Sequence, residues 1–448
     1  MTRLLAVLPI FAFVAALTVF GFAYGVAVGH YQLFPYDYLT RAKLAVTSLI
    51  EAERQKSHFV EDFELPVGLK ISASGLTTHD PEQSFAGPTF MTAFNGEYFE
   101  ARLVDMAGAV LHTWQTRFSE VFPDPTHVEY RSDDSVIALH GSWLYPNGDV
   151  LLTFVGGNFP YGGGLVKLDR DSNVEWAVER NTHHDIHVTA DGTIVALAHI
   201  HRSGPPPGLS ATQEGYLEEV VLMLSPDGEV VDEFSILAAI RDSDFRGLLS
   251  LNYRDSEDIH SPQENLGDPF HANTIEVLSA EDAANYPMFE AGDYLISLRN
   301  INMIGVISQR SRQLVWALTG IAVRQHDPDF TESGTIMLYD NRGHAGPGGR
   351  ARLLEIDPAT QRVVWRYPGS EARPFEAFSH GKMQVLPNDN VLAIAFDEGR
   401  VFEVTRAGDI VWEYRNVITT ARGEAVRDKV GWVTDARRVE PQFLTFLQ

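Results

Sequence analysis

Histidines recur at matched positions along the chain, and imidazole near neutral pH serves as an acid, a base, a nucleophile or a metal ligand. The stretch NTHHDIHVTADGTIVAL places His183, His184 and His187 directly before a β-branched run. From His184, an apolar residue follows four places on and a glycine eight places on, and the same spacing holds from His140 and from His326. Such a repeat indicates equivalent places in a repetitive fold.

Two further histidines share part of this pattern. His271 keeps an apolar partner four places on before its turn lengthens, and His380 sits one place earlier than the register requires. We expect all five histidines to open the innermost strands of a ring of sheets, so that their side chains converge on one axis. Because successive strand residues face opposite sides, His183 and His187 are expected to be strand or rim residues, and these two and His201 should not all reach the axis.

Polar residues accompany the histidines. Asn273 lies two places after His271, while Arg299 and Arg342 lie at the far ends of two following apolar runs. A guanidinium group offers a fixed fork of donors that fits carboxylate, phosphate or sulfate oxygens. Three or four axial histidines could also hold a metal ion, but a nearby Arg342 would repel a cation, so we assign no metal to this site.

One strand–turn–strand hairpin occurs six times, each time with a polar turn followed by a β-branched strand that ends near an aromatic residue. Five of the seven tryptophans fall in this slot. The six aromatic residues are Trp114, Trp176, Phe234, Trp316, Trp365 and Trp412.

These hairpins predict an all-β fold, a six-bladed β-propeller, because roughly 40–50 residues form one four-stranded blade. Two stacked β-sandwiches are the rival, but they would not repeat one turn. Insertions at 201–216 and 241–269 lengthen two intervals, and we interpret the second as a surface loop rather than a lid. The tail 431–448 should pair with N-terminal strands to complete a blade.

The N-terminus contains a long uncharged segment, residues 4–29. About 20 apolar residues span a bilayer as a helix, and no clean A-x-A cleavage site follows, which favours an uncleaved anchor. Arg3 before the helix predicts a cytoplasmic N-terminus and a globular part on the periplasmic side of the inner membrane. The predicted organisation is an anchor at 1–30, an amphipathic helical stalk at 31–65 and a propeller at 66–448.

Composition excludes several functions. The formal net charge of −25 argues against nucleic acid as a partner, because phosphates would be repelled. The chain has no cysteine, which excludes disulfides, thiol catalysis and thiolate metal sites.

Four segments resemble the bacterial arylsulfotransferase family: 88–114, DPFHANTIEVL at 268–278, RQHDPDFTESGTIMLYDNRG at 324–343, and 352–369. The resemblance spans roughly residues 66–440. It implies a six-bladed propeller with an axial site that passes a sulfuryl group between phenols through a histidine, without a nucleotide donor or other cofactor. By motif, His271 and His326 correspond to sulfate-binding histidines and Arg342 to the sulfate-binding arginine, with Arg350 also within reach.

The strand that carries the family's nucleophilic histidine corresponds to 391–404, which contains none and has Arg400 near that place. The cysteine pair of some members is also absent. The catalytic candidates are therefore His380 and His184 as nucleophile or base, together with His326. The substrate-binding candidates for a small anionic or aromatic substrate are His271, His326, Arg342, Asn273, His140 and Arg299. The alternative is a non-catalytic propeller that binds an anionic or aromatic ligand or serves as a subunit of a membrane complex.

Overall fold

The computed structural model forms two compact units, Met1–Gln55 and Lys56–Gln448, which are described separately. The structure describes residues 2–31, 33–36, 38–39, 60–62, 75–129, 131–156, 158, 160–204, 206–209, 215–251, 267–341, 350–377, 379–419 and 425–447.

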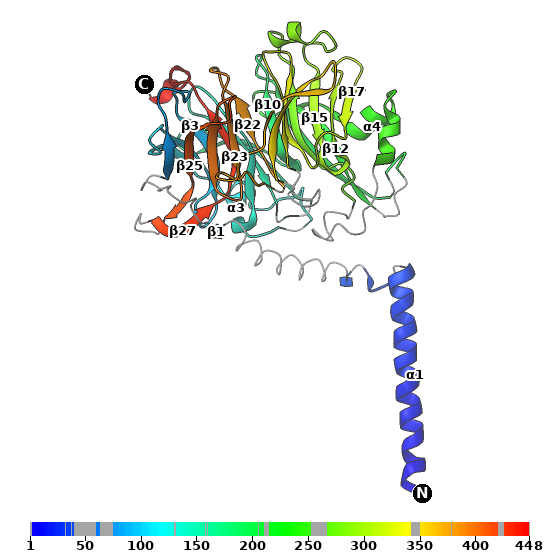
Figure 1. Ribbon diagram of the computed structural model, residues 1–448. Helices are drawn as coiled ribbons and strands as arrows, with labels where there is room; N and C mark the ends of the chain where they lie inside the picture. Colours follow the sequence, from blue (N-terminus) through cyan, green and yellow to red (C-terminus); the bar gives the residue numbers. More distant parts are fainter. Residues whose placement is uncertain are drawn as a thin grey trace. The chain divides into compact units, whose positions relative to one another are not determined.

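The first unit is dominated by helix α1 (Thr2–Tyr31), the dark blue helix of Figure 1. Its segment Ala12–Tyr31 is long and apolar enough to cross a membrane, judged by length and composition. A signal sequence would pass the same test. Of the predicted helical stalk at 31–65, the structure describes only residues 31, 33–36, 38–39 and 60–62.

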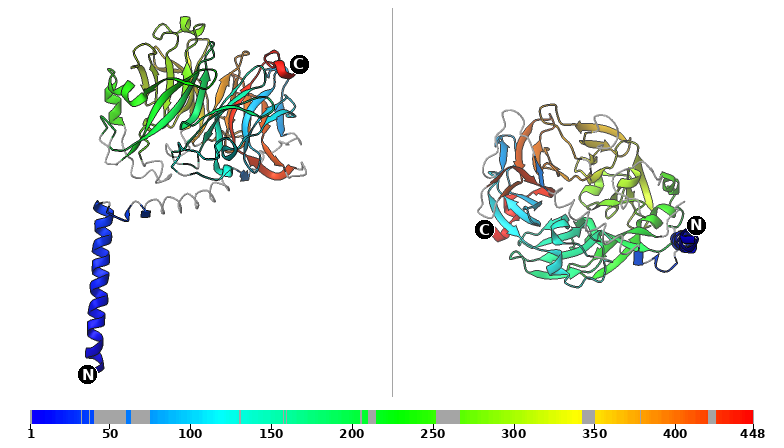
Figure 2. Two further views of the ribbon diagram at one scale, coloured as in Figure 1. Left: turned by 180° about the vertical axis from the view of Figure 1, so that it is seen from behind. Right: turned by 90° about the horizontal axis from the view of Figure 1, so that it is seen from below.

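The second unit is the predicted six-bladed propeller, and its blades form a ring in the right-hand view of Figure 2. The innermost strands of neighbouring blades contact one another around the axis. From the axis outwards, the first blade consists of β28 (Val433–Arg438), β3 (Thr89–Phe94), β4 (Phe99–Val104) and β5 (Val110–Trp114). The second blade consists of β6 (Ala138–Leu144), β7 (Val150–Val155), β8 (Gly162–Leu168) and β9 (Val174–Val178). The third blade consists of β10 (Thr182–Val188), β11 (Ile194–Arg202), β12 (Tyr216–Leu224) and β13 (Val230–Ser235).

The remaining blades follow in chain order. The fourth blade consists of β14 (Ala272–Val277), β15 (Tyr294–Leu298), β16 (Met303–Ile307) and β17 (Leu314–Thr319). The fifth blade consists of β18 (His326–Phe330), β19 (Ile336–Asp340), β20 (Arg352–Asp357) and β21 (Arg362–Tyr367). The sixth blade consists of β22 (Met383–Val385), β23 (Val391–Ala395), β24 (Arg400–Val404), β25 (Ile410–Arg415) and β2 (Leu76–His79). A separate sheet joins β1 (Val60–Asp62), β27 (Ala425–Gly431) and β26 (Val417–Thr419), and helices α3 (Phe118–Val121) and α4 (Ile236–Arg241) lie between blades or at their edges.

The two ends of the propeller chain close the ring in two blades. As predicted, the tail pairs with an N-terminal strand: β28 forms the inner edge of the first blade, in register from Val433 opposite Ala93 to Arg438 opposite Thr89. In addition, β2 forms the outer edge of the last blade against β25. Both closures remove open sheet edges, which would otherwise expose unpaired backbone groups.

The repeated aromatic residues fasten each blade to the next. Trp114 donates its indole N–H to the carbonyl of Gly148 in the following blade, at 2.8 Å. Trp412 closes the circle by donating to the carbonyl of Met106 in the first blade, at 3.0 Å. Trp316 and Trp365 make the same kind of bond to the turn of the next blade. The repeat seen in the sequence is therefore an inter-blade contact.

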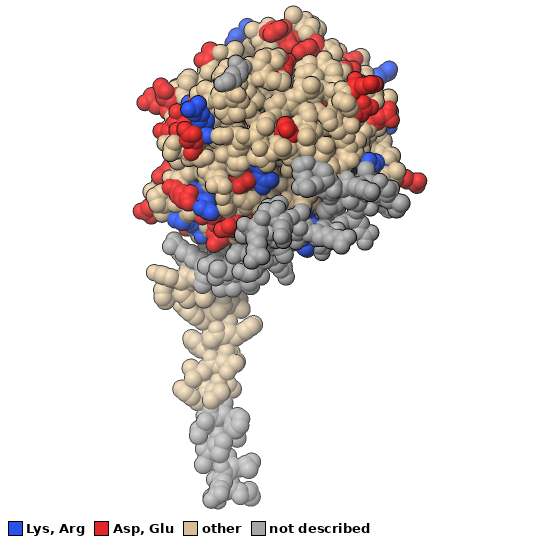
Figure 3. Space-filling view, turned by 90° about the vertical axis from the view of Figure 1, so that its left-hand side faces the viewer, with Lys and Arg blue, Asp and Glu red and all other residues tan. Residues whose placement is uncertain are grey.

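The surface of the propeller is acidic and mixed. On the face shown in Figure 3, Asp and Glu side chains outnumber Lys and Arg side chains and are scattered rather than gathered in one patch. On this face, the distribution fits a solvated surface and shows no basic stripe of the kind that binds nucleic acid.

We predict that removing residues 432–448 destabilises the whole ring, because the loss of β28 opens an inner sheet edge and uncovers the axis. The expected drop in melting temperature, followed by circular dichroism, is roughly 10 °C or more. A matched truncation that removes only 440–448 deletes the bond from Thr445 N to Pro146 O and the packing of Phe446 on Trp114, but keeps β28. Equal melting temperatures for the two truncations would contradict a closing role for β28.

Candidate active site

A β-bulge interrupts the inner strand at the same level in five of the six blades. The register shifts lie at Leu139/Ser142, His183/Ile186, Ala272/Thr274, His326/Asp329 and Val433/Asp435. A bulge adds one unpaired residue and turns the side chains beside it. His184, His271 and Asp327 also have left-handed backbones, with φ of 52°, 50° and 49°. L-residues adopt this conformation at a cost, so these bulges place particular side chains at the axis.

The five histidines of the repeat lie in one continuous series of ring contacts. Their ring centroids are separated by 4.8 Å from His271 to His184, 5.1 Å from His184 to His140, 4.6 Å from His140 to His380 and 5.7 Å from His380 to His326. We call these five residues the axial histidine cluster. The structure thus brings together the histidines that the spacing grouped, although they come from five different blades.

Hydrogen bonds fix which ring nitrogen carries the proton in two of them. The Nδ1 of His271 lies 2.5 Å from Oδ2 of Asp268, and the Nδ1 of His326 lies 2.7 Å from Oδ1 of Asn341. These oxygens accept hydrogen bonds, so both Nδ1 atoms donate and both Nε2 atoms keep a lone pair. Nε2 of His326 is buried and has no hydrogen-bond partner within the described part of the chain.

The other members are held differently. Nε2 of His380 donates to the carbonyl of Thr434 at 2.5 Å. Nδ1 of His184 lies 2.9 Å from Nδ1 of His183, and Nε2 of His183 lies 2.9 Å from Oε2 of Glu219. The Glu219 carboxylate is thus linked to His184 of the axial cluster through the His183 imidazole.

His183 is a residue of strand β10, as one of the two expected placements had it. It does not lie at the rim, because it is fully buried and contacts His184 directly. The bulge between His183 and Ile186 breaks the regular alternation of side chains at this point. His187 packs against Trp143, and His201, at the exposed end of β11, pairs with Glu129.

Burial keeps the cluster neutral. Desolvation is the main reason why the pKa of His140, His184, His271 and His326 lies well below its ordinary value of 6.5, and neighbouring imidazoles or cations lower it further. Burial lowers the pKa of His380 to about 4. Neutral imidazoles present lone pairs, so the cluster is suited to nucleophilic attack or proton transfer.

Charged groups flank His271. Burial raises the pKa of Asp268 to about 6, while the Arg299 guanidinium opposes this shift. Arg299 is itself buried, and its charge lowers the pKa of His271, His184 and His326, which places it beside the cluster. Tyr161 stacks on His271 with 5.4 Å between the ring centroids.

Two further binding residues were predicted, Asn273 and Arg342. Asn273 donates its amide to the carbonyl of Gln325 at 2.9 Å, which ties the fourth blade to the fifth. Arg342 lies outside the described residues. Arg400, noted at the place of the family's nucleophile, is buried in the last blade, pairs with Glu413 at 2.8 Å and stacks on Phe402.

Sequence reasoning missed a buried ion-pair network beside the cluster. Nζ of Lys382 lies 2.7 Å from Oδ1 of Asp185 and 2.7 Å from Oδ1 of Asp327. Asp185 and Asp327 directly follow His184 and His326, and Lys382 lies two places after His380. The available signal was a repeated charged residue one or two places after a cluster histidine.

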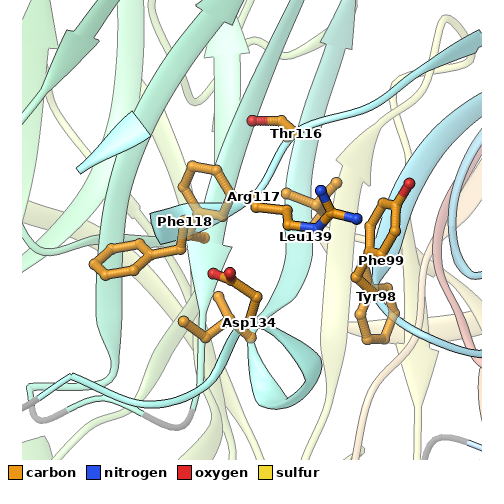
Figure 4. A pocket seen from close by; sticks show the side chains of 9 residues that line it. Tyr98, Phe99, Thr116, Arg117, Phe118, Asp134 and Leu139 are labelled. Carbon is orange, nitrogen blue, oxygen red and sulfur yellow. The ribbon is translucent and has the colours of Figure 1, made fainter. Parts of the chain in front are cut away.

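Two small pockets lie away from the histidines. The pocket in Figure 4 has a volume of about 10 Å³ and is lined by Tyr98, Arg117, Phe118 and Asp134, among others. The second, also of about 10 Å³, lies beside Gln325 and Leu338. Each has room for about one water molecule and neither includes a histidine, so neither is a substrate site.

Comparison with known protein families decides the classification. Residues 143–417 match the model of the family described as arylsulfotransferase (ASST). The chain belongs to the arylsulfotransferase family. The match includes four of the five cluster histidines and leaves out His140 and the closing strand β28 of this arylsulfotransferase-like propeller. Among curated proteins, no significant match is found.

The similarity to solved structures is distant. A protein of unknown function from Bacteroides caccae is 11% identical, with 73% of this chain and 94% of that chain covered and a TM-score of 0.43. The β-propeller domain of Swd1 from Myceliophteria thermophila is 8% identical, with 80% and 90% covered and a TM-score of 0.42. Virginiamycin B lyase from Staphylococcus aureus is 11% identical, with 62% and 69% covered and a TM-score of 0.34.

We predict that the stability of the His380→Gln variant, relative to that of the wild type, increases as the pH falls. The folded protein keeps His380 neutral down to about pH 4, whereas the unfolded chain binds a proton below about pH 6.5. The wild type therefore loses stability through this residue between pH 6.5 and 4, and glutamine cannot. The difference in unfolding free energy should shift by about 3 kcal/mol between pH 7 and 4, measured by chemical denaturation. A His380→Gln curve that runs parallel to the wild-type curve would contradict the buried neutral state.

Proposed function

We propose that this protein is an arylsulfotransferase that passes a sulfuryl group from an aryl sulfate to a phenol, with His271 as the carrier. The observation that carries the proposal is the Asp268–His271 pair at 2.5 Å within a cluster of neutral imidazoles. A carboxylate on Nδ1 holds the tautomer, leaves a lone pair on Nε2 and stabilises the positive charge that forms on attack. The sequence resemblance implied a sulfate-binding role for His271. We instead propose it as the nucleophile because Asp268 holds its Nδ1.

In the first half-reaction, Nε2 of His271 attacks the sulfur atom of the aryl sulfate. An N–S bond forms while the S–O bond to the aryl ring breaks, and the electron pair leaves with the phenolate. The resulting sulfo-imidazolium faces the carboxylate of Asp268. Arg299 beside the cluster supplies positive charge for the sulfuryl oxygens.

In the second half-reaction, an acceptor phenol attacks sulfur and the N–S bond breaks, which regenerates neutral His271. The proton of the acceptor must reach the phenolate released from the donor. His184 is placed to carry it, because its ring lies 4.8 Å from that of His271 and its Nδ1 contacts His183. No metal, nucleotide or redox step is required for this balance.

The substrate approaches from the edge of the cluster. Ring separations of 4.6–5.7 Å leave no space for an aryl group between the imidazoles. His140 is the most exposed of the five histidines, only partly buried where the others are buried. We place the aryl ring against this open side, with Arg299 as a further anion-binding group.

A second candidate is a non-catalytic propeller that binds an anionic or aromatic ligand or acts as a subunit of a membrane complex. The close packing of the cluster and the lack of a histidine in 391–404 favour this alternative. In either case we place the protein in the inner membrane through α1, with the propeller on the periplasmic side, because Arg3 precedes the apolar helix.

We predict that the full-length protein releases para-nitrophenolate from para-nitrophenyl sulfate when phenol is supplied as acceptor. His271→Ala should abolish transfer, and Asp268→Asn should lower kcat roughly 100-fold or more with little change in KM, because the lone pair would be wrongly oriented. Rapid quenching without acceptor, followed by mass spectrometry, should find the sulfuryl group on the peptide that contains His271.

The matched control is His187→Ala, which removes a histidine of the same blade as His184 that packs on Trp143. It should retain transfer. Absence of transfer by a folded wild type with several aryl sulfates, combined with saturable binding of an aryl sulfate, would contradict the enzyme and support the binding module. A sulfuryl group found on His380 or His184 would contradict the assignment of His271 as the carrier but not the transfer reaction itself.

A further inference from the structure

We propose that the third blade contains a site for a divalent transition-metal ion, with zinc as the best fit, formed by His183, His199 and Glu219. These side chains come from the neighbouring strands β10, β11 and β12. One nitrogen or oxygen ligand atom from each residue lies within 4.8 Å of those from the other two. The site lies beside the axial histidine cluster and does not use its five members.

The donor set matches zinc. Two imidazoles and one carboxylate bind Zn²⁺ in a tetrahedral arrangement that leaves a fourth position for another ligand. Tyr161 is placed to provide it: its hydroxyl lies 3.4 Å from Oε1 of Glu219, and its ring centroid lies 4.5 Å from that of His199. His199 stands directly opposite Glu219 in the β11–β12 register, so the regular sheet itself sets the two ligands side by side.

One polar group in this place lacks a hydrogen-bond partner, and another lacks an ion pair with a permanent cation. Nδ1 of His199 is buried without a hydrogen-bond partner among the described residues. Glu219 is fully buried and accepts hydrogen bonds from His183, from the Ala272 N–H and from the Tyr161 hydroxyl, but within the described part of the chain it forms no ion pair with lysine or arginine. An unpaired buried carboxylate is costly, and a bound dication would supply the missing positive charge.

Arg299 lies close to this site. Its charge acts on His271, His184 and Asp268, and also on Tyr161, the proposed fourth ligand. The negative charge of Asp268 acts on Glu219 and favours a cation. The two carboxylates therefore offset the positive charge of Arg299 near the proposed metal.

Metal binding would change which hydrogen-bonding group His184 presents to the proposed active site. Without metal, Nε2 of His183 donates to Glu219, its Nδ1 accepts from Nδ1 of His184, and Nε2 of His184 keeps a lone pair. With metal on Nε2 of His183, its Nδ1 carries the proton and donates to His184, so Nε2 of His184 carries an N–H. Occupancy thus determines whether His184 offers a lone pair or a donor to the cluster. This consequence for catalysis rests on the proposed function, whereas the metal site does not.

The test measures metal in the full-length protein purified in detergent. Elemental analysis after incubation with zinc chloride and removal of free ion should give about one zinc per chain, and cobalt substitution should give visible d–d absorption with nitrogen and oxygen ligands. His199→Gln and Glu219→Gln should each lower the affinity by roughly 10-fold or more. His201→Gln, two residues along the same strand and paired with Glu129 at the exposed edge, is the matched control and should bind as the wild type does.

Circular dichroism checks that the variants are folded. If either fails to fold, X-ray absorption of the zinc-loaded wild type decides, because it should show two imidazoles in a shell of nitrogen and oxygen only. A folded wild type that takes up no zinc, cobalt or manganese overturns the site, as does metal retained at full affinity in both folded variants. None of these measurements uses transfer activity, so failure of the metal site and failure of the proposed reaction are seen separately.

Discussion

The ion pairs of Lys382 with Asp185 and Asp327 hold together the centre on which the rest of the structure depends. These three residues belong to three different blades, and both lysine–carboxylate distances are 2.7 Å. Six inner strands converge at the axis, where polar side chains leave water and must find partners. Removing one member of a buried ion pair costs about 3–5 kcal/mol, because the other charge stays buried. Since Asp185 and Asp327 directly follow His184 and His326, the same ion pairs fix the positions of these two cluster histidines along the axis. The charged network therefore positions the site as well as the ring.

The burial that stabilises this arrangement also selects its chemistry. An exposed histidine cluster would be partly protonated near neutral pH and would attract anions by charge. Here desolvation holds the pKa of the axial histidines below its usual value, so they remain neutral and act through lone pairs and N–H groups. Positive charge for an anionic group must then come from a permanent cation, and Arg299 is the described residue placed to provide it. The division is physically reasonable: the imidazoles form and break bonds, and the guanidinium neutralises charge.

Sequence reasoning predicted the features that repeat and missed those that occur once. The six hairpins and the five cluster histidines follow from spacings that recur in several blades, whereas the closing tail follows from the need to pair an open sheet edge. The role of Glu219 did not, because its contact with His183 depends on a bulge in one strand and on one position in another. The same bulge brings His183 into contact with His184, which strict alternation along a strand would not predict. The outer closing strand β2 was missed because it is short and polar and carries no part of the repeat.

The histidine that is missing from 391–404 shows how one axial cluster can be assembled from different strands. In this chain, β24 in that segment carries Arg400, which pairs with Glu413 and stacks on Phe402, away from the contacts of the cluster. His380 enters instead from the segment before the inner strand β22 and contacts both His140 and His326. It donates a hydrogen bond to the carbonyl of Thr434 in β28, the strand of the adjacent first blade that closes the propeller. The continuity of the cluster therefore depends on ring closure: His380 bridges the second and fifth blades only because the last strand of the chain returns to hold it.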